Sequence, residues 1–464
     1  MSAVNIPDYA AKIIAALTAA GHEAFIVGGC VRDMIRGATP GDWDIATSAR
    51  PDEVKGLFSR TFDTGIKHGT VSVLCGSNVC EVTTYRIDGE YSDNRRPATV
   101  TFAGKIEEDL SRRDFTINAI AYNPTRGFVD PFDGRGDISR KIIKCVGDAE
   151  TRFGEDALRM LRAIRFAAVL GFCVNSDAVR AITKLRDNLA DISGERIREE
   201  LCKLLCGAHP DAAKLLRETG IMRQVLRGRD FGGNLDEVVS RLQVLSGGLC
   251  PPNPLQGGIT PPLDPRNEKP REARFFEGAR EAFPQPGKRY TASRECVASC
   301  TCSRAAGSVR FAHCCYRCSV SPKGTLSKAL ALFFAWADDE CEYVLRDLRF
   351  DNKTIRTVSR FVQNRALPGS RYEIKKLMRI FPPDEFEDWL HLQEISQKRC
   401  FEKIRAEAAD ILTRGECFTL RGLAVNGNDL AEVGITGKAA GEALEKFLDA
   451  VMRDPQMNVK ERLL

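Results

Sequence analysis

The chain lacks an apolar run long enough to cross a membrane, since a spanning helix needs about 20 consecutive apolar residues. It also lacks the apolar core of a signal peptide, because residues 8–20 are patterned as an amphipathic helix. Its 17 cysteines are scattered, so we expect reduced thiols and a cytoplasmic protein without a membrane partner.

An excess of either charge is also missing. The 68 basic and 63 acidic residues give a net charge of +5, which permits nucleic-acid binding without requiring it. With 464 residues, 43% of them hydrophobic, the chain is long enough for two to four domains with well-packed cores.

A glycine turn near the start carries the first functional signal. Residues 24–27 form an apolar run that predicts a buried strand. Gly28 and Gly29 follow directly and let the backbone turn tightly and approach a ligand. Arg32 lies where the next element begins. We interpret the turn and Arg32 as a candidate site for a triphosphate.

An acidic pair comes ten residues later. If the segment is extended, Asp42 and Asp44 point to the same face and repel each other unless a cation lies between them. Mg²⁺ prefers such oxygen ligands and shares them with substrate phosphates, which points to two-metal phosphoryl transfer. A solvated acidic loop is the simpler alternative. Glu81 is a candidate third carboxylate, or else an exposed strand glutamate.

The next segments complete a mixed region of strands and helices that ends near residue 145. Residues 68–74 and 79–85 alternate like paired strands, 86–97 reads as a polar loop, and 100–102 as a short strand. Arg113 precedes an apolar segment, so its guanidinium is expected at the edge of the core, where its planar fork suits a phosphate.

Residues 153–166 are predicted to form one helix. Asp156, Arg159, Arg162 and Arg165 recur every three residues and form a slowly winding stripe. Ion pairing along a solvated face is the simpler explanation. Alternatively, Asp156 accepts from an exocyclic amine while Arg159 donates to a ring acceptor, which would select cytosine and adenine over uracil and guanine.

A further amphipathic helix is expected at residues 195–205. Arg196 and Glu200 are four residues apart within it, so we expect them to form an ion pair on the surface of that helix.

Together these blocks resemble a tRNA nucleotidyltransferase of the bacterial-type class II branch, the family of CCA-adding enzymes and poly(A) polymerases. The resemblance covers about residues 20–226 and resumes weakly over 342–464. It rests on five ordered motifs, at residues 28–47, 109–119, 130–137, 155–165 and 196–205. It implies an α+β fold, with a nucleotidyltransferase head built on a small mixed β-sheet and an all-α neck, body and tail.

The resemblance also implies roles for individual residues. The implied reaction is attack by a tRNA 3′-hydroxyl on the α-phosphate of CTP or ATP, with Mg²⁺ as cofactor and no protein partner implied. The roles implied are metal ligands for Asp42 and Asp44, nucleotide contacts for Gly29, Arg32 and Arg113, a protein template for Asp156 and Arg159, and phosphate neighbours for Arg162 and Arg165.

Two alternatives remain. A-adding, CC-adding and poly(A)-polymerase activities share this chemistry, although residues 65–71 look like the tRNA-specific members. A non-catalytic RNA-binding derivative would have no reason to keep Asp42 and Asp44.

The middle of the chain departs from the family pattern. Residues 250–286 are dense in proline, glycine and charge, which argues against a packed core. The cysteines and His313 that follow lack the paired C-x₂-C spacing expected of zinc sites. An insertion, a disordered segment or a corrupted reading frame would explain the stretch. No His-Asp dipeptide occurs, so we expect no phosphohydrolase activity.

We therefore expect four parts. They are a catalytic head at 1–145, a helical neck at 146–227, an irregular insertion or disordered body segment at 228–325, and a helical, tRNA-binding body and tail at 326–464. Helices are expected in the last part at 326–336, 341–348, 352–363, 372–380, 384–408 and 439–453. Residues 423–430 resemble the family's tail signature, which would hold the tRNA elbow by shape and phosphate contacts.

Overall fold

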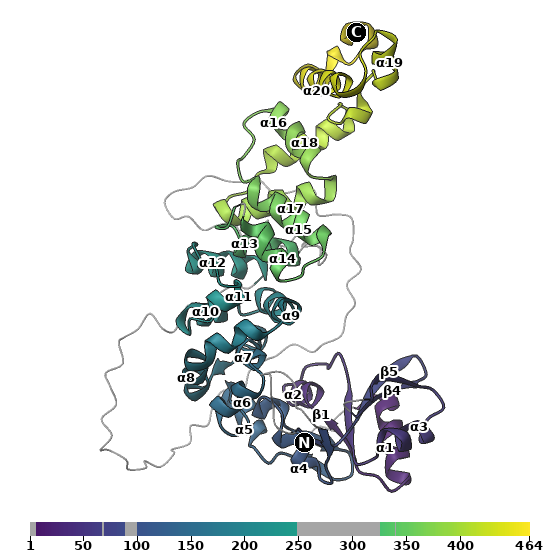
Figure 1. The fold of residues 1–464 in the computed structure, drawn as a ribbon, viewed down its shortest axis with the longest axis vertical. Helices are drawn as coiled ribbons and strands as arrows, with labels where there is room; N and C mark the ends of the chain where they lie inside the picture. Colours follow the sequence, from purple (N-terminus) through teal and green to yellow (C-terminus); the bar gives the residue numbers. More distant parts are fainter. Residues whose placement is uncertain (1–5, 67–68, 89–99, 248–324, 339) are drawn as a thin grey trace, which may run out of the picture. The chain divides into compact units, whose positions relative to one another are not determined.

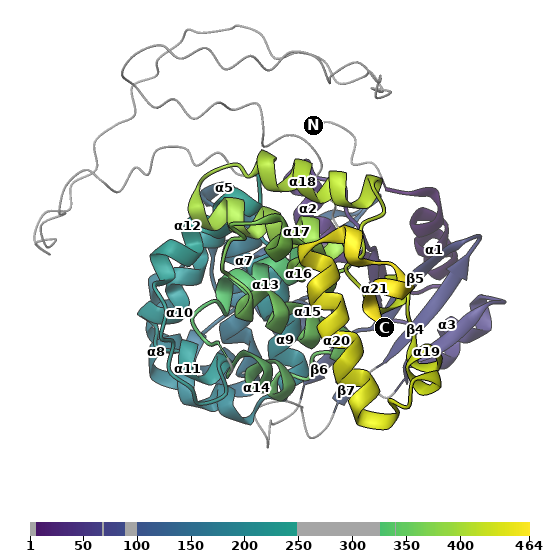
Figure 2. The same cartoon turned by 90° about the horizontal axis from the view of Figure 1, so that it is seen from above.

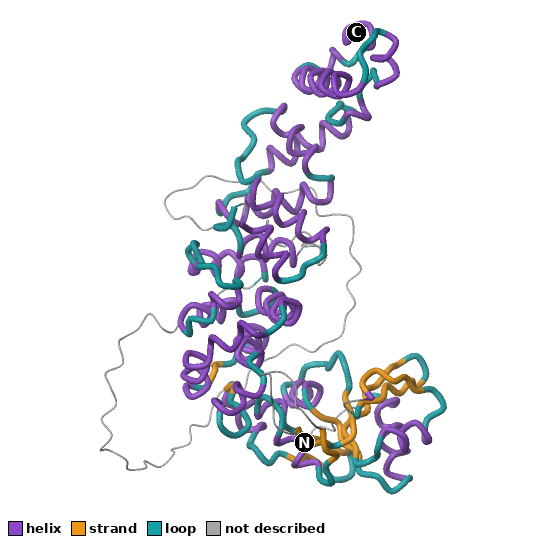
Figure 3. The backbone as a smooth tube through the Cα atoms, viewed as in Figure 1, coloured by secondary structure: helices purple, strands orange, loops and turns teal. Residues whose placement is uncertain are grey.

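Strands are concentrated in the first part of the chain, and helices make up most of the rest (Figures 1 and 3). The computed structural model describes residues 6–66, 69–88, 100–247, 325–338 and 340–464. The α+β class expected from the sequence, a mixed sheet followed by helices, is confirmed.

A seven-stranded mixed sheet forms the framework of the N-terminal region. Its strand order is β3-β4-β5-β2-β1-β8-β9. Neighbouring strands are antiparallel except for β2 and β5, which are parallel. The strands are β1 (Ala24–Val27), β2 (Asp44–Thr47), β3 (Thr61–Gly65), β4 (Thr70–Cys75), β5 (Asn78–Thr84), β8 (Ala121–Asn123) and β9 (Gly127–Val129).

Helices α1 (Asp8–Ala19) and α3 (Pro51–Leu57) pack against one face of this sheet (Figure 2). Ile26 and Ile45 point to that face and join the core that contains Leu17 and Val54. Pro51 occupies the first turn of α3, a position that its fixed φ and missing N–H favour.

The opposite face carries a second core. Phe25 and Ala46, which alternate with the residues of the first face, pack with Leu110 of α4 (Ile106–Ser111). The period-two alternation expected of a strand is thus satisfied on both sides. The polar ends of β2 and β5 lie on this second face.

One segment expected to be a loop is a strand at its beginning. Residues 86–88 form β6 (Arg86–Asp88), which pairs with β7 (Val100–Phe102), so the loop prediction is wrong there and the strand at 100–102 is confirmed. Ile87 and Phe102 are both exposed, so neither side chain marks this strand pair as part of the core. The rest of the predicted loop, residues 89–97, lies outside the described residues.

The single helix expected at 153–166 is instead two helices, α6 (Ala149–Glu155) and α7 (Leu158–Leu170). Asp156 separates them with φ −143° and ψ 103°. Its carboxylate accepts from Leu158 N at 3.1 Å. Aspartate competes for nearby backbone donors in this way, which favours helix ends over helix interiors.

The predicted helix at 384–408 is also divided, into α17 (Pro383–Gln397) and α18 (Glu402–Thr413). Lys398 has φ 52° at the end of α17, and Glu394 accepts from Phe401 N at 3.0 Å across the break. A left-handed residue ends a helix, and periodicity alone does not reveal it when that residue is not glycine.

The other helices include some that were expected and some that were not. Helices were predicted at residues 195–205, 326–336, 341–348, 352–363, 372–380 and 439–453, and the structure confirms these. In the N-terminal part the other helices include α2 (Gly29–Ile35) and α5 (Gly134–Arg140), followed after a short β10–β11 pair (Ile142–Ile143 with Cys173–Val174) by α8 (Ser176–Leu185), α9 (Gly194–Leu205), α10 (Lys214–Glu218) and α11 (Met222–Val225). Towards the C-terminus they are α13 (Thr325–Phe333), α14 (Glu340–Asp347), α15 (Asn352–Gln363), α16 (Arg371–Ile380), α19 (Gly427–Glu432), α20 (Gly437–Arg453) and α21 (Lys460–Leu463).

The stretch expected to be irregular begins with a regular helix, α12 (Leu235–Leu245), capped by the side chain of Asn234. Residues 248–324, including the cysteine-rich run considered for zinc, lie outside the described residues. Within the described ranges all ten cysteines are free thiols, and no helix there is long and apolar enough to span a bilayer.

Candidate nucleotide-binding and catalytic site

Gly28 forms the junction between β1 and α2. Its φ is 79°, a left-handed value that glycine adopts without strain. A Cβ at this position would lie 2.9 Å from Arg113 Nη1. The structure therefore brings together the glycine turn and Arg113, which the sequence placed 85 residues apart. Gly29 is close to Arg32 in the same way, since a Cβ there would lie 3.5 Å from Arg32 Nη2.

The three predicted carboxylates gather at the ends of β2 and β5. Asp44 is the first residue of β2 and is the register partner of Glu81 on the parallel strand β5. Trp43 is buried between the exposed residues Asp42 and Asp44, which is the alternation expected if both aspartates share a face. All three carboxylates thus open onto the sheet face opposite α1.

The electrostatics of this group fit a divalent cation. Desolvation by the surrounding protein raises the pKa of Asp44, although its residue is exposed; Glu81 and Asp42 raise it further, while Arg113 lowers it. A cation would relieve this crowding of like charges, and carboxylate oxygens are the ligands that Mg²⁺ prefers. Among the described residues, however, no group of three or more His, Cys, Asp or Glu side chains is arranged to hold a metal ion.

The guanidinium of Arg113 is held in place by Asp109 of α4. Asp109 is almost completely buried and accepts from Arg113 Nη2 at 3.0 Å and from Arg112 Nη2 at 2.7 Å. Burial alone would raise the pKa of Asp109, but the two guanidiniums lower it below its usual value. Asp109 thus fixes the direction of Arg113 beside the glycine turn.

Arg32 is anchored at both ends of its guanidinium. It donates to the carboxylate of Asp33 through Nε (3.0 Å) and Nη2 (2.9 Å), and to Asn118 Oδ1 through Nη1 (2.7 Å). Its central carbon lies 5.3 Å from the centroid of the Phe166 ring on α7. Arg32 therefore links α2 to the helix that carries the predicted stripe.

Asp114 is the centre of the next set of contacts. It accepts from Asn118 Nδ2 at 3.1 Å and from Arg162 Nε and Nη2 at 3.0 and 2.7 Å. Burial would raise the pKa of Asp114, but Arg162 and the hydrogen bonds lower it to about 2. An ionised carboxylate therefore connects Arg32, through Asn118, with Arg162.

Glu200 of α9 continues this network. It is buried and accepts from Arg165 Nε at 2.8 Å and from Arg162 Nη1 at 3.4 Å. Arg165 also stacks on Phe166, with 3.6 Å between its central carbon and the ring centroid. Burial lowers the pKa of Arg165, as does the like charge of Arg162, while Glu200 raises it.

Asp156 and Arg159 lie at the start of α7 but their side chains bind different partners. Asp156 Oδ2 accepts from Arg196 Nη2 at 2.7 Å. Arg159 donates to the carbonyl oxygens of Arg152 (3.0 Å) and Arg112 (3.3 Å), and pairs with Glu155. The expected ion pair between Arg196 and Glu200 within α9 is therefore wrong, because both side chains reach across to α6 and α7 instead.

Sequence analysis alone did not identify several residues of this arrangement as part of the site. What they share is that each accepts from a guanidinium predicted to bind nucleotide: Asp109, Asp114, Asn118, Glu155 and Glu200. The available signal was the basic run flanked by acids at residues 108–114, in which the acids are spaced to pair with the arginines.

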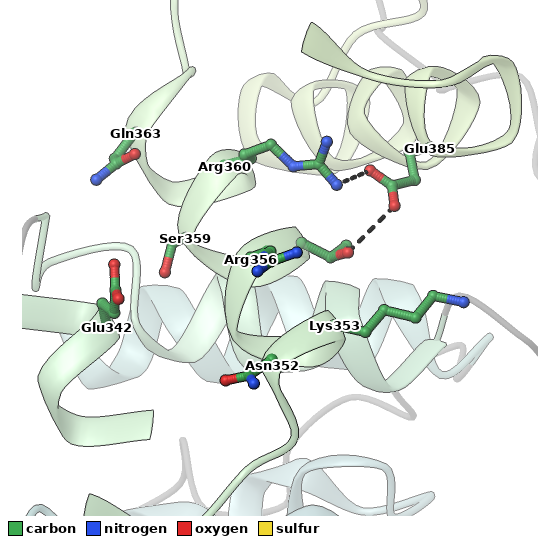
Figure 4. A pocket seen from close by; sticks show the side chains of 9 residues that line it. Glu342, Asn352, Lys353, Arg356, Ser359, Arg360, Gln363 and Glu385 are labelled. Carbon is green, nitrogen blue, oxygen red and sulfur yellow. Dashed lines mark hydrogen bonds and ion pairs between the residues drawn. The ribbon is translucent and has the colours of Figure 1, made fainter. Parts of the chain in front are cut away.

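A separate polar pocket of about 740 Å³ lies among α14, α15 and the start of α17 (Figure 4). Arg360 pairs there with Glu385, as Figure 4 shows, and Glu342 pairs with Arg346. Lys353 and Arg356 also line the pocket, and neither makes an ion pair within the described ranges. The pocket therefore presents cations whose charge is not balanced locally.

Comparisons with known proteins agree with this fold. Residues 24–144 match the Poly A polymerase head domain, and residues 171–230 match the probable RNA and SrmB-binding site of polymerase A. The CCA-adding enzyme of Geobacillus thermodenitrificans is 51% identical over 210 residues, which are 45% of this chain and 52% of that protein. The CCA-adding enzyme of Lactiplantibacillus plantarum is 54% identical over 203 residues, 44% of this chain and 50% of the relative.

The curated matches thus span about half the length of the relatives. The solved structure of the Bacillus stearothermophilus CCA-adding enzyme in complex with CTP matches more of the chain, with a TM-score of 0.70 and 30% identity over 98% of this chain and 95% of that one. The Thermotoga maritima CCA-adding enzyme complexed with tRNA shares the fold, with a TM-score of 0.56 at 18% identity, 98% of this chain and 92% of that one.

These findings first define the class: a protein with the head domain of polymerase-type nucleotidyltransferases. More narrowly, the chain belongs to the bacterial-type class II tRNA nucleotidyltransferases, the family of the CCA-adding enzymes. Members of this family generally use a divalent metal.

Proposed function

We propose that this chain adds C, C and A to the 3′ end of tRNA from CTP and ATP, without a nucleic-acid template. The observation that carries the proposal is the position of Asp44 and Glu81, in register on parallel strands beside the glycine turn and Arg113. This arrangement supports nucleotidyl transfer, and the similarity to CCA-adding enzymes supports tRNA, CTP and ATP as substrates.

Asp42 and Asp44 are the proposed ligands of Mg²⁺, and Glu81 is a proposed third carboxylate. When bound, Mg²⁺ would lower the pKa of the attacking tRNA hydroxyl and stabilise charge on the leaving pyrophosphate. The residues fit this role through the crowding of negative charge around Asp44. Asp42, Asp44 and Glu81 are all exposed, so a triphosphate can reach these carboxylates from solvent.

The nucleotide contacts proposed from the sequence have physical support from the network. Gly28 and Gly29 let the backbone and the first turn of α2 approach a phosphate, while Arg32 and Arg113 supply positive charge. An arginine has five N–H donors, and among the described residues Glu200 accepts from one of those of Arg165, at Nε. Asp156 and Arg159 are the proposed readers of the base, with Arg162 and Arg165 near the phosphates.

We further propose the division into a catalytic head (1–145), neck (146–227), middle segment (228–325) and tRNA-binding body and tail (326–464). The pocket lined by Lys353 and Arg356 supports an RNA contact in the last part, since unbalanced cations attract phosphates. The free thiols of the described residues support a cytoplasmic location, where thiols stay reduced.

The deciding experiment is incorporation of labelled CTP and ATP, separately and together, into tRNA that ends before C-C-A, in the presence of Mg²⁺. Two C and one A followed by a stop supports the proposal. Addition of a single nucleotide type points to an A-adding or CC-adding enzyme, and a long A tail points to a poly(A) polymerase. Absence of incorporation with tRNA still bound points to a non-catalytic RNA-binding protein.

The carboxylates are tested in the same assay. Asp44→Ala is expected to abolish incorporation while tRNA binding, measured by filter retention, stays within twofold of wild type. Asp63→Ala is the matched control, because Asp63 is an exposed acid of the same sheet and pairs, among the described residues, with Lys55. Incorporation that survives in Asp44→Ala contradicts the assignment of the catalytic carboxylates.

A further inference from the structure

Arg196 and Glu200 lie one turn apart on α9, and both reach across to residues predicted to contact the nucleotide. Arg196 donates to Asp156, whereas Glu200 accepts from Arg162 and Arg165. Because residues four apart share a helix face, one face of α9 presents a cation to the carboxylate and a carboxylate to the cations. We call this pair of residues the α9 clamp.

The orientation of the Asp156 side chain depends on Arg196 more than that of a residue inside a helix would. Its backbone is extended between α6 and α7, so no helix fixes the direction of its side chain. One carboxylate oxygen accepts from Leu158 N at 3.1 Å, and the other accepts from Arg196 Nη2 at 2.7 Å. These two contacts set the rotation of the carboxylate about its bond to Cβ.

The Asp156–Arg196 pair differs from a surface ion pair. The side chain of Asp156 is 16% exposed and that of Arg196 is 26% exposed. Arg196 Nη1 is buried and has no hydrogen-bond partner among the described residues. A guanidinium held with one nitrogen unsatisfied away from water carries a desolvation cost, so it needs a compensating contact, and the Asp156 carboxylate provides it.

We propose that Arg196 is a positioning residue for base selection, acting through Asp156. This inference rests on the proposed function. A carboxylate has about four acceptor positions, of which Leu158 N and Arg196 occupy two. With the plane of the carboxylate fixed, the two remaining positions have a defined direction in which to accept the exocyclic amine of cytosine or adenine. Without Arg196 the carboxylate can rotate, and this direction is lost.

The test uses the full-length chain and tRNA that ends before C-C-A. The kcat and KM are measured for CTP and UTP separately, and the ratio of the two kcat/KM values gives the discrimination. In Arg196→Ala this ratio is expected to fall about tenfold, a typical coupling between contacting residues. Arg196→Lys keeps the charge and one donor and is expected to recover part of it. Lys203→Ala, an exposed basic residue of the same helix, is the matched control and should retain the wild-type ratio.

A double-mutant cycle distinguishes positioning from a general structural effect. If Arg196 acts through Asp156, then Arg196→Ala lowers discrimination in the wild-type background but has no further effect in Asp156→Asn. An equal effect in both backgrounds overturns the inference, and so does an active Arg196→Ala with wild-type discrimination. If Arg196→Ala does not fold, by circular dichroism and thermal unfolding, Arg196→Gln replaces it and the same ratios decide.

The failure of this inference is distinguishable from failure of the proposed function. A wild-type chain that incorporates no nucleotide overturns the proposed function, and the inference falls with it. A wild-type chain that adds C and A selectively, together with an equally selective Arg196→Ala, overturns the inference alone.

Discussion

Asp114 offers the sharpest test of the polar network between α2, α7 and α9. Asp114→Asn keeps the shape of the side chain but removes the charge that faces Arg162. The pKa of Asp114 is lowered from 3.8 to about 2, and one pKa unit corresponds to about 1.4 kcal/mol, so the ionised form contributes roughly 2 kcal/mol to folding. Arg162 keeps its contact with Glu200 in the variant, so the larger loss of about 3–5 kcal/mol seen when a buried charge is left alone is not expected.

The assay is urea unfolding followed by circular dichroism at pH 7 and pH 3. Because the folded pKa is below the unfolded one, the contribution of Asp114 is complete above about pH 4 and is lost as the pH falls through about 2. The difference between wild type and Asp114→Asn should therefore be roughly halved at pH 3.

Asp177→Asn, whose carboxylate pairs with Arg180 and is 64% exposed, is the control and should change the unfolding free energy by less than about 0.5 kcal/mol. A loss below about 0.5 kcal/mol for Asp114→Asn at pH 7, or one that is equal at both pH values, refutes this reasoning.

Three other outcomes follow from the structure. Removing divalent ions with EDTA should stop incorporation and added Mg²⁺ should restore it; activity that survives chelation contradicts the metal assignment. Gly28→Ala, at φ 79° and 2.9 Å from Arg113 Nη1, should raise the KM for CTP severalfold, whereas Gly37→Ala, at φ 73° in open space, should cost a similar stability of roughly 1 kcal/mol without changing KM. Replacing both Lys353 and Arg356 by alanine should lower the slope of log Kd for tRNA against log salt by about 2, while Arg346→Ala, already paired with Glu342, should leave it unchanged.

The sheet could be predicted largely because its strands have regular patterns. The apolar run before Gly28 predicted β1. The alternating segments on either side of residues 76–78 predicted β4 and β5. The boundaries observed in the structure differ little from those predicted. The three-residue strands β8 and β9 were not predicted, although the equally short β7 was. Their places in the sheet come from pairing: β8 pairs with β1, which is a tertiary contact, and β9 pairs with β8.

The candidate site, like the sheet, could be predicted only in part. Proximity of Asp42 and Asp44 follows from their spacing alone, whereas the pairing of Asp44 with Glu81 depends on β2 and β5 being parallel. That relation requires knowledge of the strand order, which no local pattern contains. The contact between Gly28 and Arg113 likewise depends on how α4 packs on the sheet.

The pair Arg196 and Glu200 on α9 shows why charge spacing is ambiguous. Arg196 and Glu200 have the spacing of an intrahelical pair, and isolated pairs of that kind contribute only about 0.2–0.5 kcal/mol. Such a small gain is easily exceeded when a second helix offers partners away from water, as Asp156 and Arg165 do here. Spacing therefore identifies which side chains share a face, while the packing of α7 against α9 decides which charges meet. The residues that orient a site are for this reason harder to find from sequence than the residues that they orient.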